Sequence, residues 1–154
     1  YVSSQQNILL SLFKREEEFI YPVALALYEG GCLTRALFKG LTFNYSVALS
    51  IGPLLMVSCI HSMMEKGSPP LSCSDKMQEL MIRILEDLIS SGRIRSRTDP
   101  ETLYQIRCSS EQGMVLKWIA CSGEFDLNRE FKSALHLILG LDDSPETKLE
   151  QDIR

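Results

Sequence analysis

The sequence lacks the features of a disulfide framework, a zinc site or a membrane span. Its five cysteines are far apart and form no CxxC pair, a pattern that favours free thiols in a reducing cytoplasm. No uninterrupted apolar run reaches the roughly 20 residues of a membrane helix, because His61 and several serines interrupt the nearest one, at 47–64. Residues 1–13 show no basic start followed by an apolar block, so they do not resemble a signal peptide. We therefore expect a cytoplasmic protein without membrane contact.

Catalytic and nucleotide-binding motifs are also missing. The chain has no GxSxG, HExxH, P-loop or GxGxxG pattern. Cys59 and His61 come nearest to a nucleophile and its base, but side chains two residues apart on a helix point about 200° apart. The net charge is −4, and residues 99–154 carry six Lys or Arg against eleven Asp or Glu. Without a basic stripe to neutralise phosphates, we expect no nucleic-acid binding by this chain itself, no enzyme activity and no cofactor or metal.

Helical periodicity dominates what is present. The 154 residues, 45% of them hydrophobic, suffice for one all-α domain with its own core. We predict a six-helix bundle: a first helix capped by Ser4 and ended by Gly30 and Gly31, then helices at about 32–50, 53–64, 75–91, 99–122 and 126–141. Ser74, Asp99 and Asp126 are the expected N-caps of the last three. Residues 66–74 form the clearest loop, and 142–154 a frayed acidic tail.

The last two predicted helices are apolar on more than one side. The helix at 99–122 carries one stripe that includes Leu103 and Met114, and a second, opposite stripe that includes Val115 and Leu116. A helix that is apolar on two sides is buried on two sides, and the second side requires a partner, most simply a second copy of the chain. The predicted homodimer interface consists of Leu103, Ile106, Ser110, Gly113, Met114, Trp118, Cys121, Phe131, Leu135 and Ile138.

Polar, methionine and aromatic side chains on the first four helices suggest a pocket for a small molecule. Asn44 lies within an apolar stripe, where an unsatisfied amide costs on the order of 1–3 kcal/mol. It is either a handle for a ligand, an amide satisfied by a neighbouring backbone, or a side chain turned outward. His61 is either a ligand contact or a structural side chain, and the Met and aromatic side chains line either a pocket or a plain core. The candidate ligand-binding residues are Phe19, Leu37, Leu41, Asn44, Tyr45, His61, Met81 and Cys108.

Several segments resemble the C-terminal regulatory domain of the tetracycline-repressor (TetR) family of bacterial transcriptional regulators. These are residues 88–95, the Asp99-Pro100-Glu101 start, and residues 113–118, 123–127 and 134–141. Residues 2–9 are similar to the junction that follows the recognition helix in that family, although Val2 and Gln5 replace its usual aromatic and lysine residues. The resemblance covers essentially the whole chain.

This resemblance implies an effector-binding and dimerisation domain. The last two helices would pair with their twofold mates in a four-helix interface. A small, mostly apolar effector among the first four helices would then alter DNA binding by a helix-turn-helix domain that precedes Tyr1 and is missing here. The alternative is a helical protein–protein adaptor that presents its exposed apolar face to a different chain.

Overall fold

A computed structural model describes residues 2–67 and 71–141, and these residues form six helices. Their bounds are α1 (Val2–Glu29), α2 (Leu33–Ile51), α3 (Pro53–Glu65), α4 (Asp75–Ser90), α5 (Pro100–Ala120) and α6 (Leu127–Leu139). The described residues contain no strand, only an isolated antiparallel bridge between Ile94 and Leu141. The all-α, six-helix prediction is therefore confirmed. The tail predicted at 142–154 and the centre of the predicted loop, 68–70, lie outside the described residues.

The predicted N-caps explain where the last three helices begin. The side chain of Ser74 accepts a hydrogen bond from the Met77 amide at 3.4 Å. Asp99 accepts one from the Thr102 amide at 2.8 Å, and Asp126 one from the Arg129 amide at 3.0 Å. These bonds satisfy amides that have no partner within the first turn. Ser4 is not a cap, because α1 already includes Val2.

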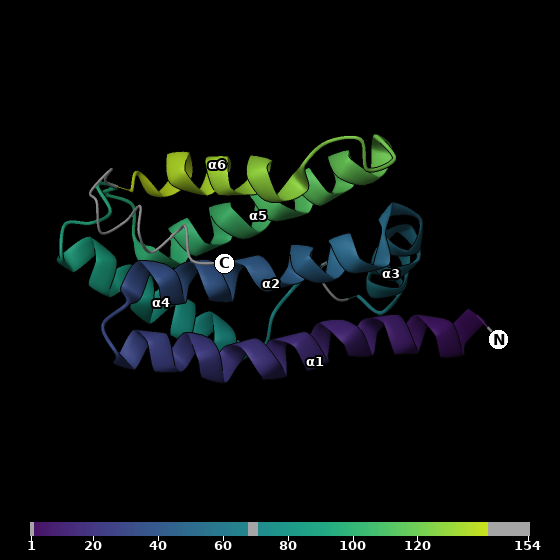
Figure 1. The fold of residues 1–154 in the computed structure, drawn as a ribbon, viewed down its shortest axis with the longest axis horizontal. Helices are drawn as coiled ribbons and strands as arrows, with labels where there is room; N and C mark the ends of the chain where they lie inside the picture. The colour runs from purple at the N-terminus through teal and green to yellow at the C-terminus, as the bar shows by residue number, and fades with distance from the viewer. Residues whose placement is uncertain (1, 68–70, 142–154) are drawn as a thin grey trace.

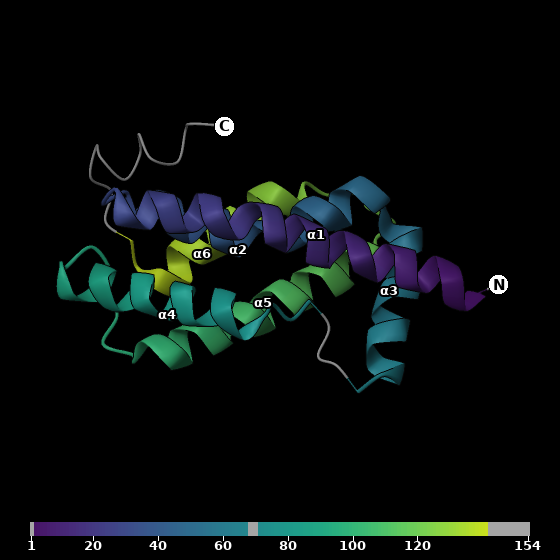
Figure 2. The same ribbon diagram turned by 90° about the horizontal axis from the view of Figure 1, so that it is seen from below.

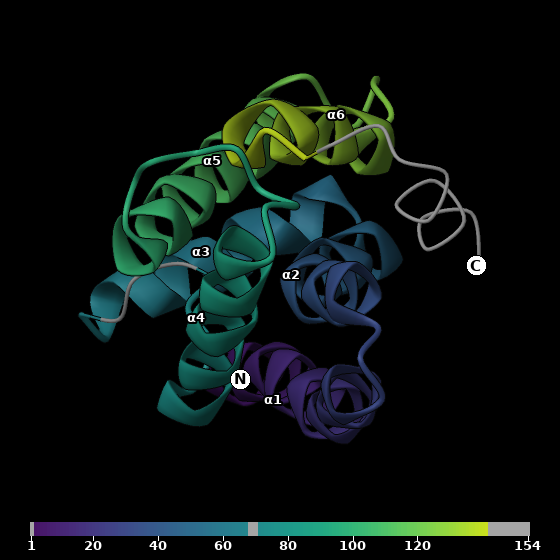
Figure 3. The same cartoon turned by 90° about the vertical axis from the view of Figure 1, so that its left-hand side faces the viewer.

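The helices are arranged in tiers that leave α5 and α6 together on one side (Figure 1). In that view α1 lies along the bottom, α2 above it, and the antiparallel α5 and α6 at the top. The end-on view in Figure 3 shows α2 and α4 between α1 and the α5–α6 pair. The linker before α5 is joined to the end of α6, where the Arg95 amide donates to the Gly140 carbonyl at 3.3 Å. One side of α5 therefore faces the interior.

Close packing of α2 against α4 fills the centre of the molecule. Gly40 makes this possible, because a Cβ atom at this position would lie 2.2 Å from the Met81 side chain. The residues of α4 that turn inward are wholly buried and recur at helical spacing. They are Met77, Leu80, Met81, Ile84, Leu85 and Leu88.

The buried face of α1 differs from the one that its apolar residues suggest. Phe13, Glu17 and Ala24 face inward, whereas Phe19 is 67% exposed and Ile8 is also exposed. Phe19 follows Glu17 by two residues, so on a helix it points about 200° away from it. Apolar character alone misplaces this face, because the inward stripe of α1 includes a carboxylate.

Candidate functional site

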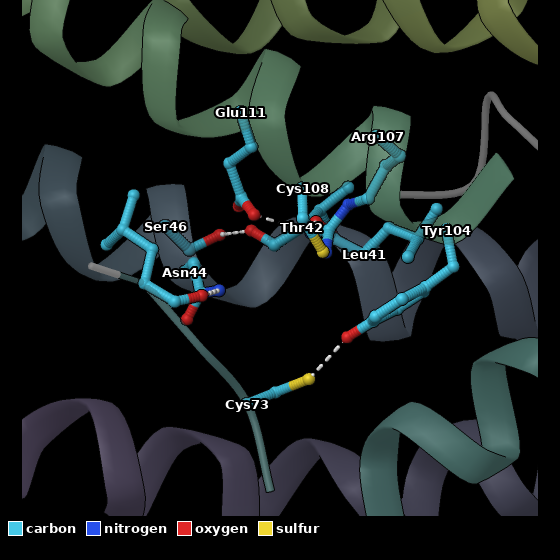
Figure 4. Close-up of polar contacts among 10 residues, drawn as sticks. Leu41, Thr42, Asn44, Ser46, Cys73, Tyr104, Arg107, Cys108 and Glu111 are labelled. Carbon is cyan, nitrogen blue, oxygen red and sulfur yellow. Dashed lines mark hydrogen bonds and ion pairs between the residues drawn. The ribbon is translucent and has the colours of Figure 1, made fainter. Parts of the chain in front are cut away.

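An ion pair is buried in the middle of α5. Arg107 and Glu111 lie one helical turn apart, and Nη2 of Arg107 is 2.8 Å from Oε2 of Glu111. Both side chains are almost fully excluded from solvent. Figure 4 shows both residues projecting from α5 toward α2. Charged residues are almost never fully buried unless they are paired, so this pair is the most unusual polar feature of the described residues.

The guanidinium of Arg107 also joins α5 to two other helices. It donates a hydrogen bond to the Leu41 carbonyl of α2 at 2.6 Å (Figure 4). Its central carbon lies 5.8 Å from the ring centre of Phe131, on α6, and 5.9 Å from that of Tyr104. A cation close to an aromatic ring is attracted by the electrons of that ring. Arg107 therefore contacts α2 and α6 at once.

Burial dominates the electrostatics of the pair. Loss of water raises the pKa of Glu111 to about 7, although Arg107 and the amide of Asn44 both lower it. Burial acts to lower the pKa of Arg107, but the Glu111 carboxylate and other neighbours raise it above its ordinary value. Oε1 of Glu111 and Nε of Arg107 have no hydrogen-bond partner among the described residues. Hydrogen bonds therefore satisfy this pair only in part.

Asn44 is held by the backbone of the connection between α3 and α4. Its Nδ2 atom donates to the Leu71 carbonyl at 2.8 Å, and the residue is buried (Figure 4). A satisfied amide does not carry the penalty expected for an unpaired one. Asn44 therefore ties a loop to α2, close to Glu111.

A thiol and a phenol meet beside this cluster. Sγ of Cys73, in the segment before α4, lies 2.6 Å from the Tyr104 hydroxyl of α5 (Figure 4). Burial raises the pKa of Cys73 above its usual value, although Tyr104 and Arg107 lower it. A thiol is nucleophilic only as the thiolate. Cys73 is therefore poorly suited to act as a nucleophile at neutral pH.

Six of the eight candidate ligand-binding residues lie in the interior. Leu37, Leu41, Asn44, Tyr45 and Met81 are buried, and Cys108 is half-buried next to Arg107. The rings of Tyr45 and Phe131 pack edge to face with centres 4.7 Å apart. The structure thus places these six inside the chain, with Leu41, Asn44 and Cys108 next to the ion pair, and whether they touch a ligand stays a prediction.

Phe19 and His61 do not belong with them. Phe19 is on the outer side of α1, as described above. The His61 side chain is exposed and lies 3.5 Å from Glu65, one turn further along α3. The face that it shares with Leu54, Val57 and Met64 is exposed throughout. Both residues therefore lie on helix faces that point to solvent, apart from the other six, and whether either touches a ligand stays a prediction.

The predicted interface residues divide into two groups. Leu103, Trp118, Phe131 and Leu135 are buried within the chain itself, so they are core residues and not an outer surface. A Cβ atom at Gly123 would lie 3.5 Å from both Pro53 and the Trp118 ring, so Trp118 packs where the turn after α5 approaches the start of α3. The other six remain at least partly accessible: Ile106, Ser110, Gly113, Met114, Cys121 and Ile138.

The two last helices differ in their outer faces. On α5, Ile106, Gly113 and Leu116 are exposed, and no exposed charge occurs between Glu101 and Lys117. On α6, the exposed side chains include Arg129, Glu130 and Lys132, with Leu137 as the exception. The outer face of α5 is thus uncharged and that of α6 is charged, so α6 lacks the second apolar side predicted for it, and for α5 this side stays a prediction.

The functional residues missed by the sequence reasoning are Arg107 and Glu111. Their signal was visible in retrospect, since these two charges share a helix face with Leu103 and Val115. Two opposite charges one turn apart more often form an exposed pair. Their burial depends on how α5 packs against α2 and α6.

Comparisons with known proteins do not identify the chain. No family model, no curated protein and no solved structure matches it. Within residues 2–67 and 71–141, no group of three or more His, Cys, Asp and Glu side chains is placed to hold a metal ion. None of the helices described is both long and apolar enough to cross a membrane.

Proposed function

We propose that this chain is the effector-binding and dimerisation domain of a transcriptional regulator similar to the tetracycline-repressor family. One observation carries the proposal: α5 is packed on its inner side by the core, while its outer side is exposed and uncharged from Thr102 to Leu116. Ile106 and Leu116 are the large apolar side chains exposed on this face, and exposed apolar side chains with no charge between them favour a surface that a partner covers.

The outer face of α5 has the shape needed for close helix contact. A Cβ atom at Gly113 would meet nothing within 4 Å, so nothing within the chain requires glycine there. Ser109 and Ser110 precede it by one turn. Small side chains let two helix backbones approach closely, and a self-complementary face of this kind favours a twofold dimer. In this proposal α5 pairs with α5 of a second copy.

The interior supplies the other half of the proposed function. The Arg107–Glu111 pair and Asn44 join α2, α5, α6 and the segment before α4, so a small molecule bound among the first four helices would change how this connected set packs. In the regulator, α1 would pass such a change to a DNA-binding domain. The size of the change in DNA affinity would be set by the coupling free energy between the effector site and the DNA-binding site.

The oligomeric state tests this proposal directly. Light scattering after size exclusion at micromolar concentration should give twice the chain mass of 17.4 kDa. The variant Leu116→Glu, on the outer face of α5, should give the monomer mass. Leu54→Glu is the matched control, because Leu54 is 81% exposed on α3 and Leu116 is 52% exposed. A monomeric unmodified chain, or a dimer that Leu116→Glu leaves intact, contradicts the proposal.

A helical adaptor is the second candidate, and the exposed face of α3 favours it. Leu54, Val57 and Met64 make an apolar surface that no other part of residues 2–67 and 71–141 covers. Such a surface on a monomer marks a site for another protein. In the light-scattering experiment, a strict monomer in every variant favours the adaptor over the regulator.

A further inference from the structure

A cleft of about 210 Å³ opens between α1 and the end of α3. Figure 2 shows the N-terminal half of α1 passing beside α3. The walls of the cleft include apolar side chains from three helices: Leu10 and Phe13 of α1, Phe43 of α2 and Met63 of α3. Phe13 and Phe43 are otherwise buried, so the cleft reaches the edge of the core.

Two lysines line the same cleft and have no acidic partner among the described residues. Lys14 comes from α1 and Lys66 follows the last turn of α3. The ammonium group of Lys66 donates to a neutral amide, the Oδ1 atom of Asn7, at 3.1 Å. Each ammonium group can therefore bind an anion without first breaking an ion pair.

The carboxylate that lines the cleft, Glu17, is engaged elsewhere. The Ser74 amide donates to both Glu17 oxygens at 3.1 Å, and the Ser74 hydroxyl donates to one of them as well. Ser74 is the N-cap of α4, where backbone amides favour a negative charge. Glu17 is thus held at the start of α4, and two lysines face this one carboxylate in the lining of the cleft.

We propose that this cleft binds a small amphipathic anion. The apolar body of the ligand would lie against Phe13 and Phe43, and its acidic group between Lys14 and Lys66. The volume is below the roughly 300 Å³ typical of sites for drug-sized ligands, so it fits a medium-chain or aryl carboxylate. The role of the cleft as the effector site rests on the proposed function. What the cleft adds to that function is the sign of the effector's charge.

The cleft is also placed to act on two helices. Leu10, Phe13 and Lys14 lie in the N-terminal half of α1, the end that would continue toward a preceding domain. Glu17 joins the same part of α1 to the start of α4. A ligand bound between Lys14 and Lys66 would therefore lie beside the part of α1 that contacts α4, and it could change that contact.

Calorimetric titration with octanoate, octylammonium and 1-octanol tests the proposal, since these share one alkyl chain and differ in charge. We expect one octanoate per chain, bound at least tenfold more tightly than octylammonium, with octanol between them. Equal affinity for the three compounds would show that the alkyl chain alone is recognised and would overturn the proposal.

Paired lysine variants locate the site. The variant Lys14→Met/Lys66→Met should reduce octanoate affinity to that of octanol. Lys117→Met/Lys132→Met has the same net charge but alters exposed residues of α5 and α6, so it should bind octanoate normally. If both double variants bind alike, the lysines of the cleft are not the ligands and the proposal is wrong.

The two proposals fail separately. Lysine-dependent octanoate binding by a chain of monomer mass would support the cleft and contradict the dimer. A dimer sensitive to Leu116→Glu that shows no preference for octanoate would contradict the cleft alone.

Discussion

The two faces of α5 reverse the usual distribution of charge. Its inner face carries Arg107 and Glu111, which are buried, while its outer face is exposed and uncharged between Glu101 and Lys117. Burying a charged pair costs solvation that only good geometry recovers, and exposing apolar surface forgoes the gain of covering it. On its inner side α5 is therefore held by specific polar contacts, while its outer side gains nothing from the contacts within this chain.

The contrast with α6 makes the same point. On α6 the buried residues Leu127, Phe131, Leu135 and Leu139 lie on one side and charged residues on the other. Hydrophobic packing alone suffices to orient such a helix. On α5 the buried apolar residues share the inner side with Arg107, whose hydrogen bond to the Leu41 carbonyl adds to their packing in orienting the helix.

The largest effect should come from breaking the inner pair. Arg107→Met leaves the Glu111 carboxylate buried without its partner, which costs about 3–5 kcal/mol of unfolding free energy. The double variant Arg107→Met/Glu111→Leu should recover most of that loss, because no buried charge remains. Urea unfolding measures both. A double variant as unstable as the single one would show that the pair is held for packing and not for its charge.

The free energy of unfolding should also fall as pH rises through the range in which Glu111 titrates. The pKa of Glu111 is raised in the fold from 4.5 to about 7, so between these values the folded chain holds a proton that the unfolded chain has lost. The free energy of unfolding therefore decreases with rising pH across this window. Thermal unfolding of Glu111→Gln beside the unmodified chain should show a flatter profile for the variant. Parallel profiles would mean that Glu111 titrates normally.

Removing the side-chain amide of Asn44, which lies close to Glu111, should lower the free energy of unfolding by a smaller amount. Asn44→Leu leaves the Leu71 carbonyl without its donor, at a cost of about 1–3 kcal/mol. Asn44→Asp is a useful companion, since it keeps the shape and places a second carboxylate near Glu111. Urea unfolding should rank the leucine variant below the unmodified chain. An increase in stability would instead show that the amide is a cost to the fold.

Substitutions at two adjacent residues of α5, one on each face, compare the contributions of the two faces to stability. Val115→Ala removes two buried methyl groups and should lower the unfolding free energy by about 2 kcal/mol, through lost transfer energy and the cavity left behind. Leu116→Ala, one residue further on, should change the stability of the folded monomer little. Its effect should be seen in the dimer dissociation constant, measured by analytical ultracentrifugation. Equal losses of monomer stability would place both residues in the core.

The smallest effects should come from the two candidate ligand-binding residues that lie on exposed helix faces. Phe19→Ala and His61→Ala alter exposed side chains and should change the unfolding free energy by no more than about 0.5 kcal/mol. Chemical denaturation at one pH suffices for this comparison. A loss several times larger for Phe19→Ala would indicate that the outer side of α1 is covered in solution.

Helix positions were predictable because their signals are local. Gly52 and Pro53 mark the break between α2 and α3, and Asp99 followed by Pro100 marks the start of α5, as the structure confirms. Cap chemistry and backbone restriction act over one turn. A single sequence therefore contains the information that places these ends.

The faces of the helices were harder to predict where polar residues turn inward. Glu17 and the Arg107–Glu111 pair were not expected in the interior, and Phe19 was not expected outside. A charge is buried when a distant segment supplies its partner, as Ser74 does for Glu17. That partner is remote in sequence, so periodicity gives no sign of it.

The number of helices and most of their ends follow from the sequence alone, because periodicity and capping act within a turn or two. Which side of α5 is core, where Asn44 finds its acceptor, and the meeting of Lys14 and Lys66 in one cleft follow only from the packing of the helices. Those features depend on contacts between residues far apart in the chain, whose free energy exists only once the helices have packed.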